Sequence, residues 1–531
     1  MKTQTTAPRL RLQAGQFNLC VLASFLFLIW SAIFIWQSSF IALDGQRHFS
    51  LFDDAMISMR YAWNFAHGLG LVWNAGEYVE GYSNLLMTLI MSAASLVLDK
   101  ESAVLTIQLL GIPTGLGIAF LTRQISRMLF PANTHLADLA FISILFYAPT
   151  WYWSLLGMES ALLSLLLLAS VFCALRWLKN RRSRELILTG VFLGLAFLTR
   201  NESLLLAGLV FGYLAFRLWR SKAQKADFLM LGYALLCYAL FVLAQLGFRY
   251  WYYGSLVPNT YVLKVMGMPL SVKLAWGWKY IWVFLSQTWP LLCVALVGIA
   301  MHRSRDVIAL AVPFLVLLVY QVSVGGDSFR VWRILLPGMP FIFILAALTI
   351  IDLSARFARQ VRWLPFLLTL VLFVITGIPL WTFIYDEAGL MRQTTANQHN
   401  VNVALGINAV TSADATIGVI WAGAIPYYAD RQAIDFLGKC DPYIASLPAD
   451  LKMSVIGHNK YDLQYSIRKR EPTYIQNFEW ANENLKPWVV KHYIRANYAT
   501  PHGDITLILK RNDPTVNWEI TKLIPWPEDE Q

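Results

Sequence analysis

Long apolar runs separated by short polar segments dominate the first 385 residues of the chain. The runs Phe17 to Gln37 and Trp363 to Tyr385 contain no charged residue. Each is long enough to cross the roughly 30 Å hydrocarbon core of a bilayer as a helix, which rises about 1.5 Å per residue. The pattern predicts eleven membrane-spanning helices, at residues 17–39, 104–122, 136–153, 160–178, 186–199, 203–219, 228–250, 279–300, 306–323, 334–351 and 363–385.

The orientation of these helices follows from the placement of lysine and arginine. Up to residue 385, 19 of them fall on one side of the predicted spans and 10 on the other. Because cytoplasmic loops are enriched in lysine and arginine, we expect the richer side to be cytoplasmic. This assignment requires that the short apolar run at 84–98 does not cross the membrane. The alternative is that 84–98 crosses and 136–178 contains a single span. We prefer the first, which leaves Arg123 and Arg127 in the cytoplasm.

Composition supports a lipid environment and marks a second domain. Of all residues 57% are hydrophobic and 14% are charged, whereas soluble domains average about 25% charged. The last 91 residues, from Asp441 on, contain 23 charged residues, an ordinary share for a soluble domain. The sequence therefore predicts an all-α polytopic membrane domain at 1–385 and a small soluble α/β domain at 386–531. Eleven spans from a cytoplasmic N-terminus would place the second domain outside the cell membrane.

The net charge of +11 does not indicate a nucleic-acid partner. The basic residues form short clusters between apolar runs, without a basic stripe interleaved with aromatic residues. The five cysteines show no metal-ligand spacing and no disulfide framework. The chain also has no phosphate-binding Gly-rich loop with Lys-Ser/Thr and no His-Glu-x-x-His motif. ATP-driven transport and metalloproteolysis are therefore not expected.

The first predicted outer loop, 40–83, is dense in polar groups. Asp53 and Asp54 open a helical stretch in which Arg60 and His67, seven residues apart, share one face. Charges this close to a membrane are costly unless they are paired or used. One aspartate could cap the helix. The other would then be free to act as a base or to bind a divalent cation such as Mg²⁺ or Mn²⁺.

Other predicted outer loops add matching groups on the same side of the membrane. Any one of them could be a structural ion pair or a snorkelling lysine. Together, carboxylates and cations at one membrane depth predict a site for an anionic ligand. The candidates are Glu80, Tyr82, Glu159, Arg200, Glu202, Asn259, Tyr261, Lys264, Asp327, Arg330 and Arg333.

The stretch FDDAMISMRYAWNFAHGLGLVWNAGEYVEGYSN (52–84) resembles the first outer loop of bacterial GT-C type glycosyltransferases. It is most similar to the group around the mycobacterial terminal arabinofuranosyltransferase and the pilin arabinosyltransferases. The similarity continues, in family order, at GMESALLSLLLL (157–168), GLAFLTRNESLLL (194–206), YYGSLVPNTYVLK (252–264), GGDSFRVWRILLPGMPF (325–341) and IDFLGKCDPYIA (434–445). Met158, Ser328 and Val331 depart from the family pattern near the expected sugar pocket, which leaves the sugar open.

The resemblance implies an inverting glycosyltransferase of the bacterial inner membrane. Its donor would be a polyprenyl-phosphate sugar such as decaprenyl-phospho-arabinofuranose, and its acceptor a hydroxyl of a cell-envelope glycan or protein. Asp54 or Asp53 would be the general base, with a slight preference for Asp54. Arg330, Arg333, Lys264 and Arg60 would serve the donor phosphate. The remaining substrate-binding candidates are His67, Glu80, Tyr82, Glu159, Arg200, Glu202, Asn259, Tyr261 and Asp327. The alternative is a transporter or flippase of a lipid-linked sugar, although the sequence shows no internal repeat.

Overall fold

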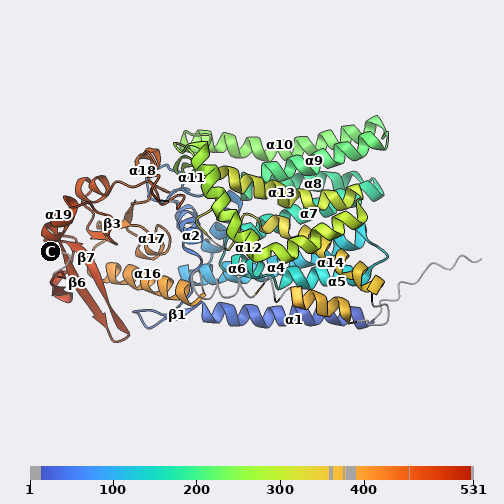
Figure 1. Ribbon diagram of the computed structural model, residues 1–531. Helices are drawn as coiled ribbons and strands as arrows, with labels where there is room; N and C mark the ends of the chain where they lie inside the picture. The colour runs from blue at the N-terminus through green and yellow to red at the C-terminus, as the bar shows by residue number, and fades with distance from the viewer. Residues whose placement is uncertain are drawn as a thin grey trace, which may run out of the picture.

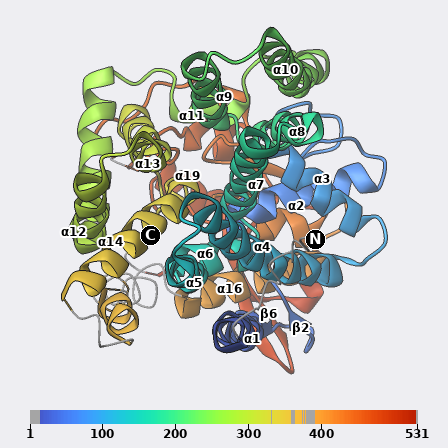
Figure 2. The same cartoon turned by 90° about the vertical axis from the view of Figure 1, so that its right-hand side faces the viewer.

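The computed structural model describes residues 14–329, 331–357, 363–372, 374, 377, 390–453 and 455–527. Long helices form a bundle that carries the C-terminal domain at one end (Figure 1). We call this end of the bundle the domain end. Figure 2 views the same bundle from its opposite end, along the helices. The bundle contains α1 (Ala14–Gln37), α4 (Lys100–Leu129), α5 (Thr134–Leu145), α6 (Ala148–Leu155), α7 (Glu159–Asn180), α8 (Ser183–Thr199), α9 (Ser203–Arg220), α10 (Lys225–Tyr253), α12 (Leu270–His302), α13 (Arg305–Val324), η1 (Leu336–Gly338) and α14 (Met339–Phe357).

Eight segments within the described residues are long and apolar enough to cross a membrane, and each matches a predicted span. The predicted span at 186–199 is α8, with 17 residues. The one at 136–153 is divided into α5 and α6, and Pro149 lies in the first turn of α6, where its missing N–H costs nothing. Of the predicted span 363–385, the structure describes residues 363–372, 374 and 377, and the others lie outside the described residues. The prediction of a polytopic helical membrane region is confirmed.

The apolar run at 84–98 forms the short helix α3 (Leu85–Ser95), with 11 residues. At about 1.5 Å per residue such a helix reaches roughly half of the hydrocarbon thickness. It packs instead against α2 (Asp53–Ala66), and the Ser92 hydroxyl donates to the Ala62 carbonyl at 3.2 Å. This length agrees with the prediction that 84–98 does not cross.

Glycines allow close helix packing in the bundle. A Cβ at Gly190 of α8 would lie 2.3 Å from the Ala234 carbonyl oxygen of α10. A Cβ at Gly277 of α12 would lie equally close, 2.3 Å, to the Val322 carbonyl oxygen of α13. Small residues let membrane helices approach until their backbones touch, which increases van der Waals contact where lipid provides no hydrophobic driving force.

The C-terminal domain is built on a mixed six-stranded sheet with strand order β4-β3-β5-β7-β6-β8. β3 pairs in parallel with β4 and β5, and the remaining pairs are antiparallel. The predicted α/β character of the tail is confirmed. Its elements are α16 (Leu390–Val410), β3 (Thr416–Val419), α17 (Ala424–Ala429), β4 (Gln432–Asp435), α18 (Pro442–Ser446), η2 (Gln464–Lys469), β5 (Tyr474–Ile475), α19 (Leu485–His492), β6 (Tyr493–Thr500), β7 (Gly503–Lys510), η3 (Trp518–Ile520) and β8 (Lys522–Ile524).

Arg60 of α2 fastens the C-terminal domain to the bundle. Its guanidinium donates to the carbonyl oxygens of Trp73 at 3.0 Å, Pro426 at 2.5 Å and Arg431 at 2.9 Å. It also pairs with the Asp430 carboxylate at 3.3 Å. Because this buried cation binds groups of both parts of the chain, it holds the domain against the loop that follows α2.

Residues 40–83 provide further contacts with the domain. The small hairpin of β1 (Phe40–Ile41) and β2 (Arg47–His48) precedes α2. The Trp73 indole N–H donates to the Ala422 carbonyl at 3.1 Å. The Asn74 side chain bonds both backbone groups of Ala433 in β4, at 2.8 and 3.0 Å. The loop and the sheet therefore form one continuous polar interface.

Candidate functional site

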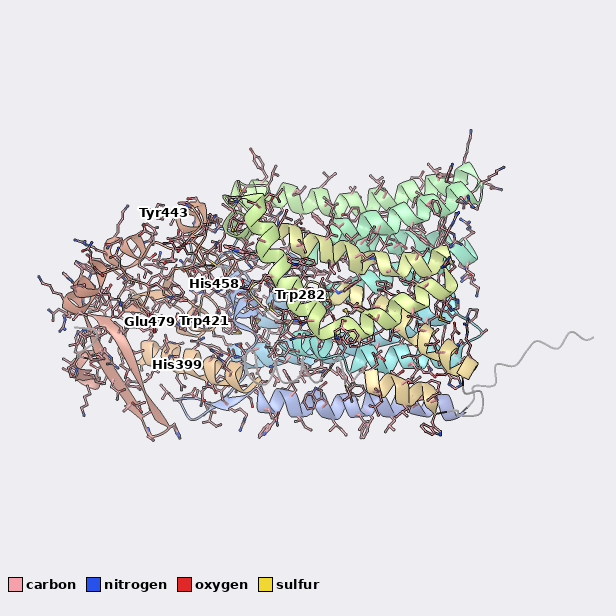
Figure 3. The ribbon with its side chains drawn as sticks, viewed as in Figure 1. Trp282, His399, Trp421, Tyr443, His458 and Glu479 are labelled. Carbon is pink, nitrogen blue, oxygen red and sulfur yellow. The ribbon has the colours of Figure 1, made fainter. Side chains whose placement is uncertain are left out.

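A cavity of about 670 Å³ lies between the domain end of the bundle and the C-terminal domain. Asp53 and Asp54 line it from α2, and Lys439 and His458 line it from the domain. Figure 3 shows His458 where the domain meets the helices. A pocket built by both domains with convergent charged groups is the expected form of an active site.

Asp54 is held as a carboxylate by surrounding cations. Its Oδ1 lies 2.5 Å from the Lys439 ammonium, and its Oδ2 lies 3.8 Å from the Arg333 guanidinium. Burial alone would raise the pKa of Asp54, but the charges of Lys439, Lys264 and Arg333 outweigh it and hold that pKa well below its usual value. Asp54 is therefore ionised at neutral pH.

Asp53 has the opposite surroundings, although it is the adjacent residue. Its Oδ1 accepts a hydrogen bond from the Ala424 amide at 3.0 Å, at the first residue of α17. Burial raises the pKa of Asp53 to about 6, against the opposing effects of the Ala424 amide and Lys439. Asp53 thus caps a helix of the other domain, whereas the N-cap of its own helix, Phe52, has no side-chain cap.

Gly423, directly before α17, allows this contact. A Cβ at Gly423 would lie 2.0 Å from the Asp53 carbonyl oxygen and 2.7 Å from Asp53 Oδ1. Real Cβ atoms do not approach oxygen this closely, so a side chain here would push α17 away from α2. The absence of a side chain therefore brings the domain into contact with the two aspartates.

The cationic side of the site comes from two loops of the bundle. Arg333 makes a two-pronged bond to Asp327, at 2.6 and 3.0 Å. Lys264 is the last residue of α11 (Asn259–Lys264). Its side-chain ammonium has no hydrogen-bond or ion-pair partner among the described residues. Burial and the charge of Arg333 lower the pKa of Lys264 to about 8, with Asp54 and Asp327 opposing. The Lys264 ammonium is thus a largely buried cation that no carboxylate binds directly, and neither Lys264 nor Arg333 is among the residues that line the cavity. Arg330 lies outside the described residues.

A buried ion-pair network contains three further candidates. Arg200 pairs with both Glu159 and Glu202. Asn84 donates to Glu159 at 3.1 Å and accepts from Ser58 of α2 at 2.9 Å. The network therefore ties α2 to the loops before α7 and α9, and its one guanidinium faces two carboxylates, which leaves one negative charge in excess.

Several predicted residues do not line the cavity. The Glu80 carboxylate is bound by Arg249 at 2.5 and 3.0 Å, and both side chains are buried. The Tyr82 hydroxyl contacts that of Tyr253 at 3.2 Å. His67 stacks on Trp63 with ring centroids 4.0 Å apart. His67 and Arg60 line a different pocket, of about 400 Å³, and Tyr261 is 46% exposed.

Asn259 acts on the site through Lys439. Its side-chain amide donates to the carbonyls of Gly438 and Lys439, at 2.9 and 3.0 Å. The same loop is held from the other side by Asp435, which accepts from the amides of Leu437 at 2.9 Å and Cys440 at 2.7 Å. The Lys439 backbone is thus fixed between α11 and β4, and this directs the ammonium at Asp54.

Lys439 and His458 were missed by the reasoning from sequence. Lys439 lies in the block IDFLGKCDPYIA, so the family resemblance contained a signal that was not used. Nothing local to His458 distinguishes it from an ordinary surface histidine. Burial lowers the pKa of His458 to about 4, so its imidazole is neutral at physiological pH.

The residues present do not fit a divalent cation. Among the described residues, no three His, Cys, Asp or Glu side chains gather as a set that could hold a metal ion. The oxygens of Asp54 face an ammonium and a guanidinium, and Asp53 Oδ1 faces a backbone amide. We therefore derive no step through a metal.

These features define a class of protein, a polytopic helical membrane protein whose C-terminal α/β domain closes over charged loops at one end of the bundle. In fold, the chain is similar to several solved proteins. ArnT from Cupriavidus metallidurans bound to undecaprenyl phosphate matches with a TM-score of 0.55 and 10% identity, over 92% of this chain and 98% of that one. The oligosaccharyltransferase AglB from Archaeoglobus fulgidus, in complex with an inhibitory peptide and a dolichol-phosphate, matches with a TM-score of 0.50 and 9% identity, over 96% and 75%.

Identities this low establish the fold alone. Residues 389–518 match a family described as a domain of unknown function (DUF8728). No curated protein sequence matches the chain. The closer resemblance to the arabinofuranosyltransferase group remains a prediction.

Proposed function

We propose that the chain is an inverting glycosyltransferase that moves a sugar from a polyprenyl-phosphate donor to a cell-envelope acceptor on the outer face of the membrane. The observation that carries the proposal is the Asp54 carboxylate at the domain end, which lies 3.8 Å from the Arg333 guanidinium and within the electrostatic influence of Lys264. The likeness in fold to proteins solved with undecaprenyl phosphate and dolichol-phosphate supports a lipid phosphate as ligand. Arabinofuranose, implied by the sequence resemblance, is our first candidate for the sugar.

The donor phosphate is assigned to Lys264 and Arg333. Nε and Nη2 of Arg333 already bind Asp327, so the phosphate is assigned to the Nη1 side of this guanidinium and to the Lys264 ammonium, which adds a point charge. Both stabilise the negative charge that grows on the phosphate as its bond to the anomeric carbon breaks. The products are the glycosylated acceptor and the free polyprenyl phosphate.

Asp54 is assigned as the general base. The acceptor oxygen forms a bond to the anomeric carbon while its proton passes to the Asp54 carboxylate. In the free protein three cations make Asp54 a weak base. A bound donor phosphate would neutralise Lys264 and Arg333, so it would raise the pKa of Asp54 when a base is needed. Asp53, which holds Ala424, is assigned a positioning role.

The test is transfer of a radiolabelled sugar from its polyprenyl phosphate to endogenous acceptor in membranes. Asp54→Asn keeps the size of the side chain but removes the base, so we expect a fall in rate of roughly 10²- to 10⁴-fold. Asp53→Asn should retain much of the activity, because its amide oxygen can still accept from Ala424. Asp414→Asn, at an exposed position of the domain, is the matched control. Full activity of Asp54→Asn would refute the base. A flippase would leave the acceptor unlabelled.

A further inference from the structure

The cavity has two aromatic walls that differ in exposure. On the bundle side, Phe52 and Trp153 are buried, and Phe52 packs edge-on against Phe329 with ring centroids 4.6 Å apart. On the domain side, Trp421 is 46% exposed and Trp480 is 38% exposed. Large exposed rings beside a charged cavity in an aqueous domain mark a binding surface rather than a core.

The backbone at Trp421 is held from both sides. The Ile420 and Trp421 amides donate to the Gln476 side-chain oxygen, at 2.7 and 2.9 Å. Three residues after Trp421, the Ala424 amide is bound by Asp53. The segment that carries the indole is therefore fixed relative to the aspartates. Figure 3 shows Trp421 at the same junction of domain and bundle as His458.

Both charged and uncharged polar groups line the cavity with these rings. Asp53, Asp54, Lys439 and Arg392 are the charged residues that line the cavity, whereas Tyr152 and His458 are uncharged, the His458 imidazole being neutral at physiological pH. Asn477, Gln393 and Ser328 supply amide and hydroxyl groups. A flat apolar face beside neutral donors and acceptors complements a sugar ring, which has apolar C–H faces and hydroxyls at its edge.

A peptide acceptor finds less support at this place. Extended peptides are commonly bound by addition to a free sheet edge. β4, the edge strand that leads to the Lys439 loop, has both backbone groups of Ala433 bonded to Asn74. This edge is covered, so a peptide could not pair with it there.

We propose that Trp421 and Trp480 form the acceptor subsite and that it takes a neutral carbohydrate, with one sugar ring stacked on the Trp421 indole. The proposal rests on the function proposed above and specifies its acceptor class. The stacked ring lies on the domain side of the cavity, and its neighbouring hydroxyl reaches Asp54. Trp421 and Trp480 are specificity-determining residues that bind acceptor and take no part in proton transfer.

The experiment measures binding separately from transfer. Saturation-transfer-difference NMR on the full-length protein in lipid nanodiscs would use three neutral trisaccharides, of arabinofuranose, mannose and glucose, and an uncharged Ser/Thr peptide of similar mass. We expect one trisaccharide to bind, and Trp421→Ala to weaken that binding at least fivefold. Trp421→Phe should retain most of it, which also shows that the site is folded. Trp282→Ala, at a 59% exposed position of α12, is the control and should bind normally.

In the transfer assay, Trp421→Ala should raise the acceptor KM about tenfold and leave the donor KM unchanged. Asp54→Asn should lose transfer but still bind the trisaccharide, so failure of the base and failure of the subsite give different results. The subsite is overturned if no trisaccharide binds, if Trp421→Ala binds as well as the wild type, or if the peptide alone gives a signal.

Discussion

Two adjacent carboxyl groups with opposite protonation behaviour characterise the site at the scale of single residues. Asp54 faces cations and keeps its charge, whereas Asp53 faces a backbone amide in a buried setting and takes up a proton near pH 6. Neighbouring acids with pKa values set apart in this way commonly divide two roles between them. The division supports a base at Asp54 and a positioning group at Asp53.

The raised pKa of Asp53 predicts a dependence of stability on pH. Because the folded-state pKa, about 6, exceeds the unfolded value of 3.8, Asp53 favours folding below about pH 4, and this contribution is lost as pH rises through 6. The shift corresponds to at most about 3 kcal/mol, at roughly 1.4 kcal/mol per unit. In thermal unfolding experiments in detergent, the stability of Asp53→Asn relative to that of the wild type should increase between pH 4 and 6.5. A pH-independent difference between the two would contradict the assignment.

Lys264 predicts a second pH effect, on donor use. With a pKa of about 8, this ammonium loses its proton under mildly alkaline conditions, so kcat/KM for the donor should fall above pH 8. Lys264→Arg should move the fall to higher pH, and Lys264→Gln should abolish it with a tenfold or larger rise in donor KM. Lys279→Gln, at an exposed position of α12, serves as control. If kcat/KM for the donor fell at the same pH in Lys264→Arg as in the wild type, Lys264 would not be the group whose proton is lost.

Sequence reasoning found the half of the site that lies near the membrane. Asp53, Asp54, Lys264 and Arg333 were predicted because they lie in loops on the same side of the helical pattern. Lys439 was missed because it pairs with Asp54 across 385 residues, and no periodicity reports such a contact. Arg60 was predicted to serve the donor phosphate, and the structure places its guanidinium against the backbone carbonyls of Pro426 and Arg431 in the domain.

At the scale of elements, the length of the apolar runs predicted the long helices. It did not predict where a run is divided into two helices, which only the structure shows. The run 136–153 is apolar throughout, yet the chain turns between α5 and α6. At the other end of α6, the Ser154 carbonyl lies against Gly111 of α4, 2.2 Å from where a Gly111 Cβ would be. This close packing holds α6 against a segment distant in sequence, and a hydropathy pattern does not predict such a contact.

Gly423 tests the contact between α17 and α2. Gly423→Ala places a Cβ 2.0 Å from the Asp53 carbonyl oxygen, so α17 must shift. We expect a loss of about 1–3 kcal/mol in stability, as for other overpacked sites, and a clear loss of transfer activity. Gly208→Ala is the matched control, since nothing lies within 4 Å of a Cβ at that position. Thermal unfolding would measure the change in stability, and the transfer assay would measure the change in activity. If Gly423→Ala matched Gly208→Ala in stability and in activity, the contact between α17 and α2 would be unimportant.

At the scale of the whole molecule, the reaction centre is completed by the docking of two parts of the chain. The bundle supplies Asp54, Lys264 and Arg333, and the domain supplies Lys439 and Trp421. All of them lie at the domain end, while the arginine-rich turn between α12 and α13 lies at the opposite end (Figure 1). The side of the membrane on which the domain lies therefore decides which compartment supplies the acceptor.

This orientation can be tested by cysteine labelling in intact cells. Asp414→Cys marks the exposed surface of the domain, and Arg303→Cys marks the exposed turn after α12. If the lysine- and arginine-rich side is cytoplasmic, a membrane-impermeant maleimide added outside should label Asp414→Cys at once. It should label Arg303→Cys only after the cells are permeabilised. Wild-type protein gives the background: Cys20, Cys173 and Cys440 are buried, and the more exposed Cys237 and Cys293 lie within the candidate membrane spans α10 and α12. The reverse pattern would put the cavity in the cytoplasm, where a cell-surface acceptor could not reach Asp54.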